Sequence, residues 1–283
     1  MQDLYLNTAG EDSADETLIE FNNLLCHPGA EKAIAAAISD HLARESWDSL
    51  TLNGFVEGAG LDALEAAFGD TKWEKTLVPS YYVNLARLRQ TNNEYESVLG
   101  PKVRKHLRQN FRMYGDVHID EAGDVPGALE MLNELAELHQ RSWIARGQPG
   151  VFSSPRFIAF HRALITRAFS RGGIQLLRVA TKSDVIGILY NFIYRNKVYF
   201  YQSGLQYGQD RRMRPGFVSL ARAIQFCVAR GLDDFDFLAG DADYKQWLST
   251  DCRQLAWLSF QKRSMKWRVF ELLRRARHWR STD

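Results

Sequence analysis

Residues 174–205 (IQLLRVATKSDVIGILYNFIYRNKVYFYQSGL) constrain the fold most, because their hydrophobic side chains repeat every second residue. Two turn signals, KSD and RN, divide the stretch into three β-rich runs, which predicts an antiparallel meander. Residues 215–230 return to helical spacing and end at Gly231, and Leu220, Ile224, Cys227 and Val228 share one face of this predicted helix. DDFDFL and QLAWLSFQK are two further strands around a loop. The predicted order is therefore β-β-β-α-β-loop-β.

The chain before the meander is mostly helical in pattern. One short strand, WDSLTLNGF, is predicted among helices at residues 29–44, 61–69, 95–114, about 126–146 and 157–171. The helix at 95–114 has Val103, Leu107 and Phe111 at four-residue spacing, with lysines and arginines around them. This pattern is typical of a basic amphipathic helix.

Charge is divided unevenly along the chain. Residues 1–70 contain 14 acidic side chains but only Lys32 and Arg44, a net charge of −12, against +14 for residues 71–283. The second part therefore favours an anionic ligand such as a phosphate-rich cofactor, a nucleic acid or a lipid headgroup. The three cysteines form no CxxC pair, which argues against a zinc cluster or a disulfide framework, and no signal-peptide pattern or long apolar run is found. We expect a cytoplasmic protein without a metal.

The run RRMRPGFVSL places three arginines and a Pro-Gly pair directly before the helix at 215–230. The first N–H groups of a helix have no intrahelical partner, and Pro215 has no N–H to leave unpaired. Because Gly216 has no side chain, a phosphate can approach the backbone there. The predicted cofactor phosphate site is Arg211, Arg212, Arg214, Pro215, Gly216, Phe217 and Val218. The alternative is a plain helix start with solvated arginines.

Several ordered runs together resemble one known family. They are LIEFNNLL, VRKHLRQNFR, LHQRSWIARGQPGVF, FHRAL, VYFYQSGL, RPGFVSLARAI and FDFLAGDADYKQWL, and they extend over most of residues 4–262. The chain resembles the GNAT acyltransferases and, more narrowly, the FemAB/CelD-like branch associated with polysaccharide systems. The resemblance implies an α+β fold, with a mixed, mostly antiparallel sheet flanked by helices. It also implies acyl-CoA as co-substrate.

The resemblance suggests three parts. We expect a partial N-terminal GNAT-like subdomain at residues 1–90, an acyltransferase domain at 91–262 and a basic amphipathic tail at 263–283. The EFNNLL-like run begins early compared with the family, so the first half looks incomplete. A second copy of the chain, as in a homodimer, could complete it. The family's Gly-Asp-Glu-like run is Gly240-Asp241-Ala242-Asp243 here, so Asp243 would replace the glutamate.

The resemblance also implies roles in acyl transfer. The strand end with Gln202 and Ser203 would face the thioester and its cofactor, and the backbone there would bind the oxyanion. Asp241 and Asp236 are the candidate bases, and Tyr244 is the candidate proton donor to the thiolate. Lys245 would bind an acidic substrate or the cofactor phosphates. The alternatives are structural: Asp236 would hydrogen-bond at a strand end, Tyr244 would pack in the core, and Lys245 would lie on the surface.

The amine acceptor, an amino sugar or amino acid, needs a pocket of its own. Candidates ahead of the meander are Trp143, Arg146, Phe152 and His161, and a further candidate is Tyr201 near the end of its third strand. Aromatic residues at such positions also commonly form core. Neither His139 nor His161 has a second histidine at metal-ligand spacing.

Two other functions compete with acyl-CoA chemistry. The basic helix around residues 103–112 would suit tRNA, and FemAB-like relatives include enzymes that take aminoacyl-tRNA as donor. The incomplete first half and the missing glutamate would suit a catalytically silent scaffold or binding protein. The tail, KRSMKWRVFELLRRARHWR, would either lie on an anionic membrane surface or pack on the domain.

Overall fold

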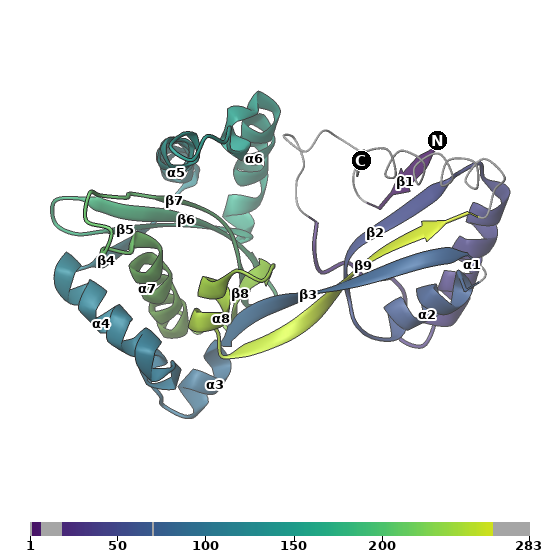
Figure 1. Cartoon of the computed structure of the whole chain (residues 1–283), viewed down its shortest axis with the longest axis horizontal. Coiled ribbons are helices and arrows are strands. Elements are labelled where there is room, and N and C mark those ends of the chain that lie inside the picture. Colours follow the sequence, from purple (N-terminus) through teal and green to yellow (C-terminus); the bar gives the residue numbers. More distant parts are fainter. Residues whose placement is uncertain (1, 7–18, 70, 263–283) are drawn as a thin grey trace, which may run out of the picture. The chain divides into compact units, whose positions relative to one another are not determined.

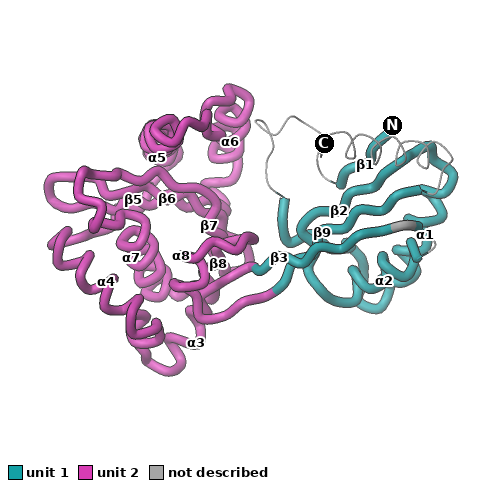
Figure 2. The backbone as a smooth tube through the Cα atoms, viewed as in Figure 1, with its two compact units in different colours: residues 1–11, 18–79, 254–283 teal, residues 12–17, 80–253 magenta. Residues whose placement is uncertain are grey.

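The computed structural model describes residues 2–6, 19–69 and 71–262, which form two compact units. Of the described residues, 2–6, 19–69, 71–79 and 254–262 form one unit, and 80–253 form the other (Figure 2). Strands β3 (Lys72–Asn84) and β9 (Asp251–Gln261) run from one unit into the other. The domain limits expected at 1–90 and 91–262 stay predictions, and the basic tail at 263–283 lies outside the described residues.

The larger unit is a layered sheet with helices on both faces (Figure 1). Its strand order is β3-β8-β7-β6-β5-β4, antiparallel throughout except that β7 pairs with β8 in parallel. Helices α5 and α6 lie on one face, and α7 and α4 lie on the other. The remaining bounds are α3 (Leu85–Gln90), α4 (Pro101–Tyr114), β4 (His118–Glu121), α5 (Val125–Ile144), α6 (Pro155–Ala168), β5 (Ile174–Ala180), β6 (Val185–Tyr194), β7 (Lys197–Leu205), α7 (Pro215–Ala229), β8 (Asp234–Ala239) and α8 (Asp243–Leu248).

The predicted meander and the helix after it are confirmed. Strands β5, β6 and β7 pair in sequence order, and α7 packs on them through Leu220, Ile224 and Cys227, all buried. Because helices cover both faces, the middle of β6 is buried almost without interruption. The structure confirms the mixed, mostly antiparallel sheet flanked by helices.

The periodicity of the sequence did not predict several strands and helices. The largest is β3, whose sequence KWEKTLVPSYYVN mixes charges and a proline with its apolar residues and lacks clear alternation. Strands β1 (Asp3–Tyr5) and β4 and helices α3 and α8 are short. The prediction of a single helix at 95–114 is wrong in one respect. The segment forms a 3-10 turn at Tyr95–Val98 and then helix α4, which begins at Pro101. Proline is favoured at a first helical position and cannot sit inside the helix.

The smaller unit has its own core. Its strands lie in the order β1-β2-β9-β3, with β1 and β2 (Ser49–Val56) parallel and β2 and β9 antiparallel. Helices α1 (Glu31–Arg44) and α2 (Ala59–Ala67) occur where the sequence predicts them. Phe55, Leu61 and Phe260 are buried together in this core.

Candidate active site

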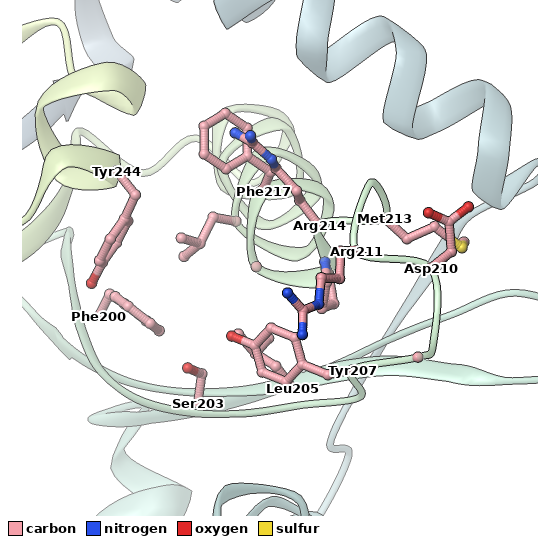
Figure 3. Close-up of a pocket in the computed structure, with 14 residues that line it drawn as sticks. Phe200, Ser203, Leu205, Tyr207, Asp210, Arg211, Met213, Arg214, Phe217 and Tyr244 are labelled. Carbon is pink, nitrogen blue, oxygen red and sulfur yellow. The ribbon is translucent and has the colours of Figure 1, made fainter. Parts of the chain in front are cut away.

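The site begins where two parallel strands separate. Strands β7 and β8 pair only at Lys197–Asp234, Val198–Phe235 and Tyr199–Asp236, after which β7 continues to Leu205 without β8. Strand β8 turns at Leu238, whose φ is +62°, and at Gly240, whose φ is +124°. The separation leaves room for a cavity of about 570 Å³ beside the second half of β7 (Figure 3).

This cavity, called the larger cavity below, is formed by β7, the loop after it, the start of α7 and one side chain of α8. Figure 3 shows Tyr244 and Phe200 on one side of it and Tyr207, Arg211 and Arg214 on the other. The lining residues are Phe200, Ser203, Leu205, Tyr207, Gly208, Asp210, Arg211, Met213, Arg214, Pro215, Gly216, Phe217, Leu220 and Tyr244.

Helix α4 holds the loop in place. The side chain of Asn110, 2% exposed, accepts a hydrogen bond from the backbone N–H of Arg214 at 2.7 Å. The N–H groups of Phe217 and Val218 donate to the carbonyl of Arg214, so the first turn of α7 is closed by these bonds. Pro215 has no N–H, and helix geometry leaves the N–H of Gly216 without an intrahelical partner at the cavity wall. This arrangement is suited to a phosphate oxygen.

The three predicted arginines do not behave alike. Arg211 and Arg214 line the cavity, and the Arg214 guanidinium lies 5.8 Å from the centre of the Phe217 ring. Arg212 instead donates to Asp210, with Nη2 2.7 Å from Oδ2. These hydrogen bonds lower the pKa of the Asp210 carboxyl to about 2. Arg212 is therefore engaged in organising the loop.

A smaller cavity of about 280 Å³ adjoins the first. The two share Ser203, Leu205, Tyr207 and Tyr244, so the second half of β7 is a wall of both. The other lining residues of the smaller cavity come mainly from the end of α5 and the loop after it, and they are His139, Ser142, Trp143, Arg146 and Gln202. Gln202, expected at the cofactor, therefore lies at the smaller cavity.

His139 is held in one orientation. Gln140 donates from Nε2 to the carbonyl of Pro149 at 2.6 Å, which leaves its Oε1 to accept from Nδ1–H of His139 at 3.2 Å. A proton on Nδ1 leaves a lone pair on Nε2 when the ring is neutral. Burial lowers the pKa of His139, the hydrogen bond to Gln140 raises it by a smaller amount, and the nearby charge of Arg146 lowers it again. The imidazole is thus kept neutral near pH 7.

Gly150 is required for this packing. Its φ is +65°, and a Cβ at this position would lie 2.4 Å from Gln140 Oε1 and 3.1 Å from His139 Cε1. A glycine satisfies both the backbone angle and the close approach.

Tyr244 reaches both cavities from α8. Burial, with a smaller contribution from Tyr207, raises the pKa of its phenol to about 12. The hydroxyl is therefore protonated at neutral pH and can donate a proton.

The two candidate bases lie outside both cavities. Asp241 is exposed and accepts a hydrogen bond from the hydroxyl of Tyr81 at 3.1 Å. Asp236 is 1% exposed and accepts from Ser80 and from the N–H of Leu238. Burial raises the pKa of Asp236 to about 6 despite the guanidinium of Arg253. Lys245 donates to the carbonyls of Leu238 and Ala239, so it supports the turn that ends β8.

Four other predicted site residues pack in the core, three of them buried (Phe152, His161 and Val218) and one partly buried (Tyr201). Phe152 packs edge-on against His139 and is 4% exposed. His161 is 1% exposed between the hydroxyls of Tyr190 and Tyr201, at 3.3 and 3.2 Å from its ring nitrogens, and burial lowers its pKa to about 4. Val218 is buried against Val117, Val179 and Ile186. Their apolar surroundings make these side chains part of the packing, and none of them lines either of the two cavities.

The site residues that the sequence analysis missed include His139, Asn110 and Tyr207. His139 lies one turn after Leu135 on the buried stripe of α5, where it looks like core, and Asn110 lies in a helix that its charges dominate. Tyr207 follows the last strand of the meander, where no periodic pattern applies.

No helix in the described part of the chain is long and apolar enough to cross a membrane. Among these residues there is also no group of three or more His, Cys, Asp or Glu side chains that could hold a metal ion.

The fold and the cavity at its diverging strands agree with a family model. The model of the acetyltransferase (GNAT) domain matches residues 101–246, just over half of the chain, so the chain belongs to this family. No curated protein matches the sequence.

Solved structures show the same fold at low sequence identity. FemX superposes with a TM-score of 0.58 at 9% identity, over 85% of this chain and 78% of its own. L-PGS from Bacillus licheniformis has a TM-score of 0.52 at 10% identity, over 87% and 78%. The C-terminal domain (DUF2156) of a putative lysylphosphatidylglycerol synthetase from Agrobacterium fabrum has a TM-score of 0.52 at 10% identity, over 81% and 72%. At 9–10% sequence identity, these three comparisons show a shared fold and nothing more.

Proposed function

We propose that the chain is an N-acyltransferase that moves an acyl group from acyl-CoA to an amine, an amino sugar or amino acid of envelope or polysaccharide metabolism. The observation that carries the proposal is the pair of adjoining cavities that share Ser203, Leu205, Tyr207 and Tyr244. A two-substrate transfer needs such a meeting point, because the reacting atoms must be held in contact.

The larger cavity would hold the cofactor. Its phosphates would bind Arg211, Arg214 and the N–H of Gly216, where positive charge and an unpaired donor converge. The acyl end would then extend along β7 toward Ser203 and Tyr244. The backbone of this part of β7, free of β8, would supply the donor for the oxyanion.

The smaller cavity would hold the amine. His139 would take the proton of the ammonium group at Nε2, because neither Asp241 nor Asp236 lies at a cavity wall. The neutral nitrogen attacks the thioester carbon, the N–C bond forms and the C–S bond breaks. Tyr244 then gives its proton to the departing thiolate, and the second proton of the attacking nitrogen passes to the tyrosinate, which leaves a neutral amide and restores Tyr244. His139 and Tyr244 thus act as base and acid in this proposal.

Titration calorimetry with CoA and acetyl-CoA tests the cofactor site. We expect binding that falls at least 10-fold in Gly216→Glu, whose carboxylate would occupy and repel the phosphate position. Arg171→Gln, which removes an exposed charge from the turn before β5, is the control and should bind as the unmodified chain does. Equal affinity of the Gly216 variant for CoA would contradict the assignment of this cavity.

An aminoacyl-tRNA donor is the second candidate. Lys102, Lys105 and Arg112 are exposed on α4, and no described residue forms an ion pair with them. The name of one structural neighbour, a lysylphosphatidylglycerol synthetase, describes a lipid that carries a lysyl group. This hypothesis expects tRNA binding that weakens steeply with salt and is lost in the combined Lys102→Gln, Lys105→Gln, Arg112→Gln variant. Absence of tRNA binding at low salt would exclude it. Absence of both tRNA and CoA binding would favour a scaffold.

A further inference from the structure

The smaller cavity has an unusual balance of charge. None of the described residues that line it is an Asp or a Glu, whereas Arg146 lines it as a permanent cation. An ammonium group alone would find no carboxylate to bind there. The cavity is therefore electrostatically unsuited to a purely cationic amine and suited to one that also carries a negative group.

Arg146 lies at the wall of the smaller cavity and belongs to no ion pair among the residues that the structure describes. Within the described part of the chain no carboxylate lies within ion-pair distance of it. Its guanidinium lies 5.8 Å from the ring centre of Trp143 and 5.8 Å from that of Tyr207. Contact with aromatic faces holds a guanidinium in place and leaves its edge donors for an oxygen ligand. An arginine held in this way can bind a carboxylate through two parallel hydrogen bonds.

Size limits the ligand further. At about 280 Å³ the cavity is near the lower end of small-molecule sites. Trp143, which stacks on His139 at 5.6 Å between ring centres, adds an apolar wall. A small molecule, or the end of a larger one, fits these limits.

We propose that the acceptor is a small amine that carries a carboxylate, bound by Arg146, with its amino group directed to His139 and the shared wall of the two cavities. The inference rests on the proposed acyl transfer and names its substrate class. A phosphate on a small amine would satisfy the same arginine, so the test includes one.

The experiment compares matched acceptors. Thiol release from acetyl-CoA is followed with amino acids and their amides, which differ only in the carboxylate, and with glucosamine 6-phosphate and glucosamine. We expect a KM roughly 10- to 100-fold lower for the acids than for the amides, as expected for a lost charged hydrogen bond. Arg146→Gln should remove this preference by raising the KM of the acids while that of the amides and kcat change little. Arg141→Gln, which removes a charge in the last turn of α5 and outside the cavity, should preserve the preference.

Calorimetry with the same compounds in the presence of CoA separates the two proposals. Tighter binding of the amino acids than of their amides, lost in Arg146→Gln, supports the inference even if no acyl transfer is seen. In that case only the proposed function fails. Equal binding of acids and amides, or equal losses for both in Arg146→Gln, overturns the inference while CoA binding leaves the transferase proposal intact. Preference for glucosamine 6-phosphate over every amino acid replaces the carboxylate by a phosphate and overturns the class stated here. No binding by any of these compounds also overturns it.

Discussion

At the scale of single residues, the pH profile distinguishes His139 from the two aspartates. Because burial lowers the pKa of His139, the rate should rise with pH through a value below 6.5 and reach a plateau by neutral pH. His139→Gln should lower kcat about 100-fold, within the usual range for a lost general base. It should also abolish this rise of the rate with pH, the acid limb of the profile. Steady-state rates from about pH 5 to 9 measure both effects.

The Arg146→Gln variant gives this assignment a second check. Because the charge of Arg146 lowers the pKa of His139, its removal should move the acid limb to higher pH. Asp241→Asn should leave the limb where it is, since Asp241 is exposed and lies at neither cavity wall. A limb that disappears in Asp241→Asn and persists in His139→Gln would return the role to the aspartate.

At the scale of elements, the approach of α5 to β7 sets the geometry of the smaller cavity. A Cβ on Gly204 would lie 2.4 Å from the carbonyl oxygen and 2.8 Å from the Cα of Leu135, both backbone atoms of α5. Gly204→Ala must therefore displace the helix that carries His139 and Trp143. We expect a loss of about 1–3 kcal/mol in the free energy of unfolding, as for overpacked cores, and a raised KM for the acceptor.

Chemical denaturation and kinetics test this expectation. Gly123→Ala is the matched control, because its Cβ would meet no atom within 4 Å. An unchanged acceptor KM in a destabilised Gly204→Ala chain would mean that the position of α5 does not govern the smaller cavity.

Element by element, the sequence predicts what periodicity encodes. The meander, α7 and β8 follow from regular spacing, and Arg211, Arg214 and Gly216 follow from the chemistry of a helix start. The position of Asp241 outside the cavities could not be predicted, because it depends on the turn of β8 at Leu238, an αL residue without a sequence signal. The role of His139 depends on Gln140 and Gly150, which only the folded loop brings to it.

At the scale of the whole molecule, two buried groups give opposite dependences of stability on pH. Burial lowers the pKa of His161 from 6.5 to about 4, so its contribution to stability is present above about pH 6.5 and is lost as the pH falls toward 4. Burial raises the pKa of Asp236 from 3.8 to about 6, so its contribution is present below about pH 4 and is lost as the pH rises through 6. Each change corresponds to about 3 kcal/mol, so in the unmodified chain the two largely offset between about pH 4 and 6.

Removing one group should reveal the other. Asp236→Asn keeps an oxygen to accept from Ser80 and Leu238, so the variant should fold, and its free energy of unfolding should then fall by up to about 3 kcal/mol as the pH is lowered from 6.5 to 4. His161→Gln should show the reverse slope, losing stability as the pH rises from about 4 to 6, because only Asp236 still titrates. Urea denaturation at half-unit steps of pH measures both slopes. Parallel curves for the unmodified chain and Asp236→Asn would show that Asp236 has the same pKa in the folded and the unfolded chain. Ionisation of this buried carboxylate would then not lower the free energy of unfolding.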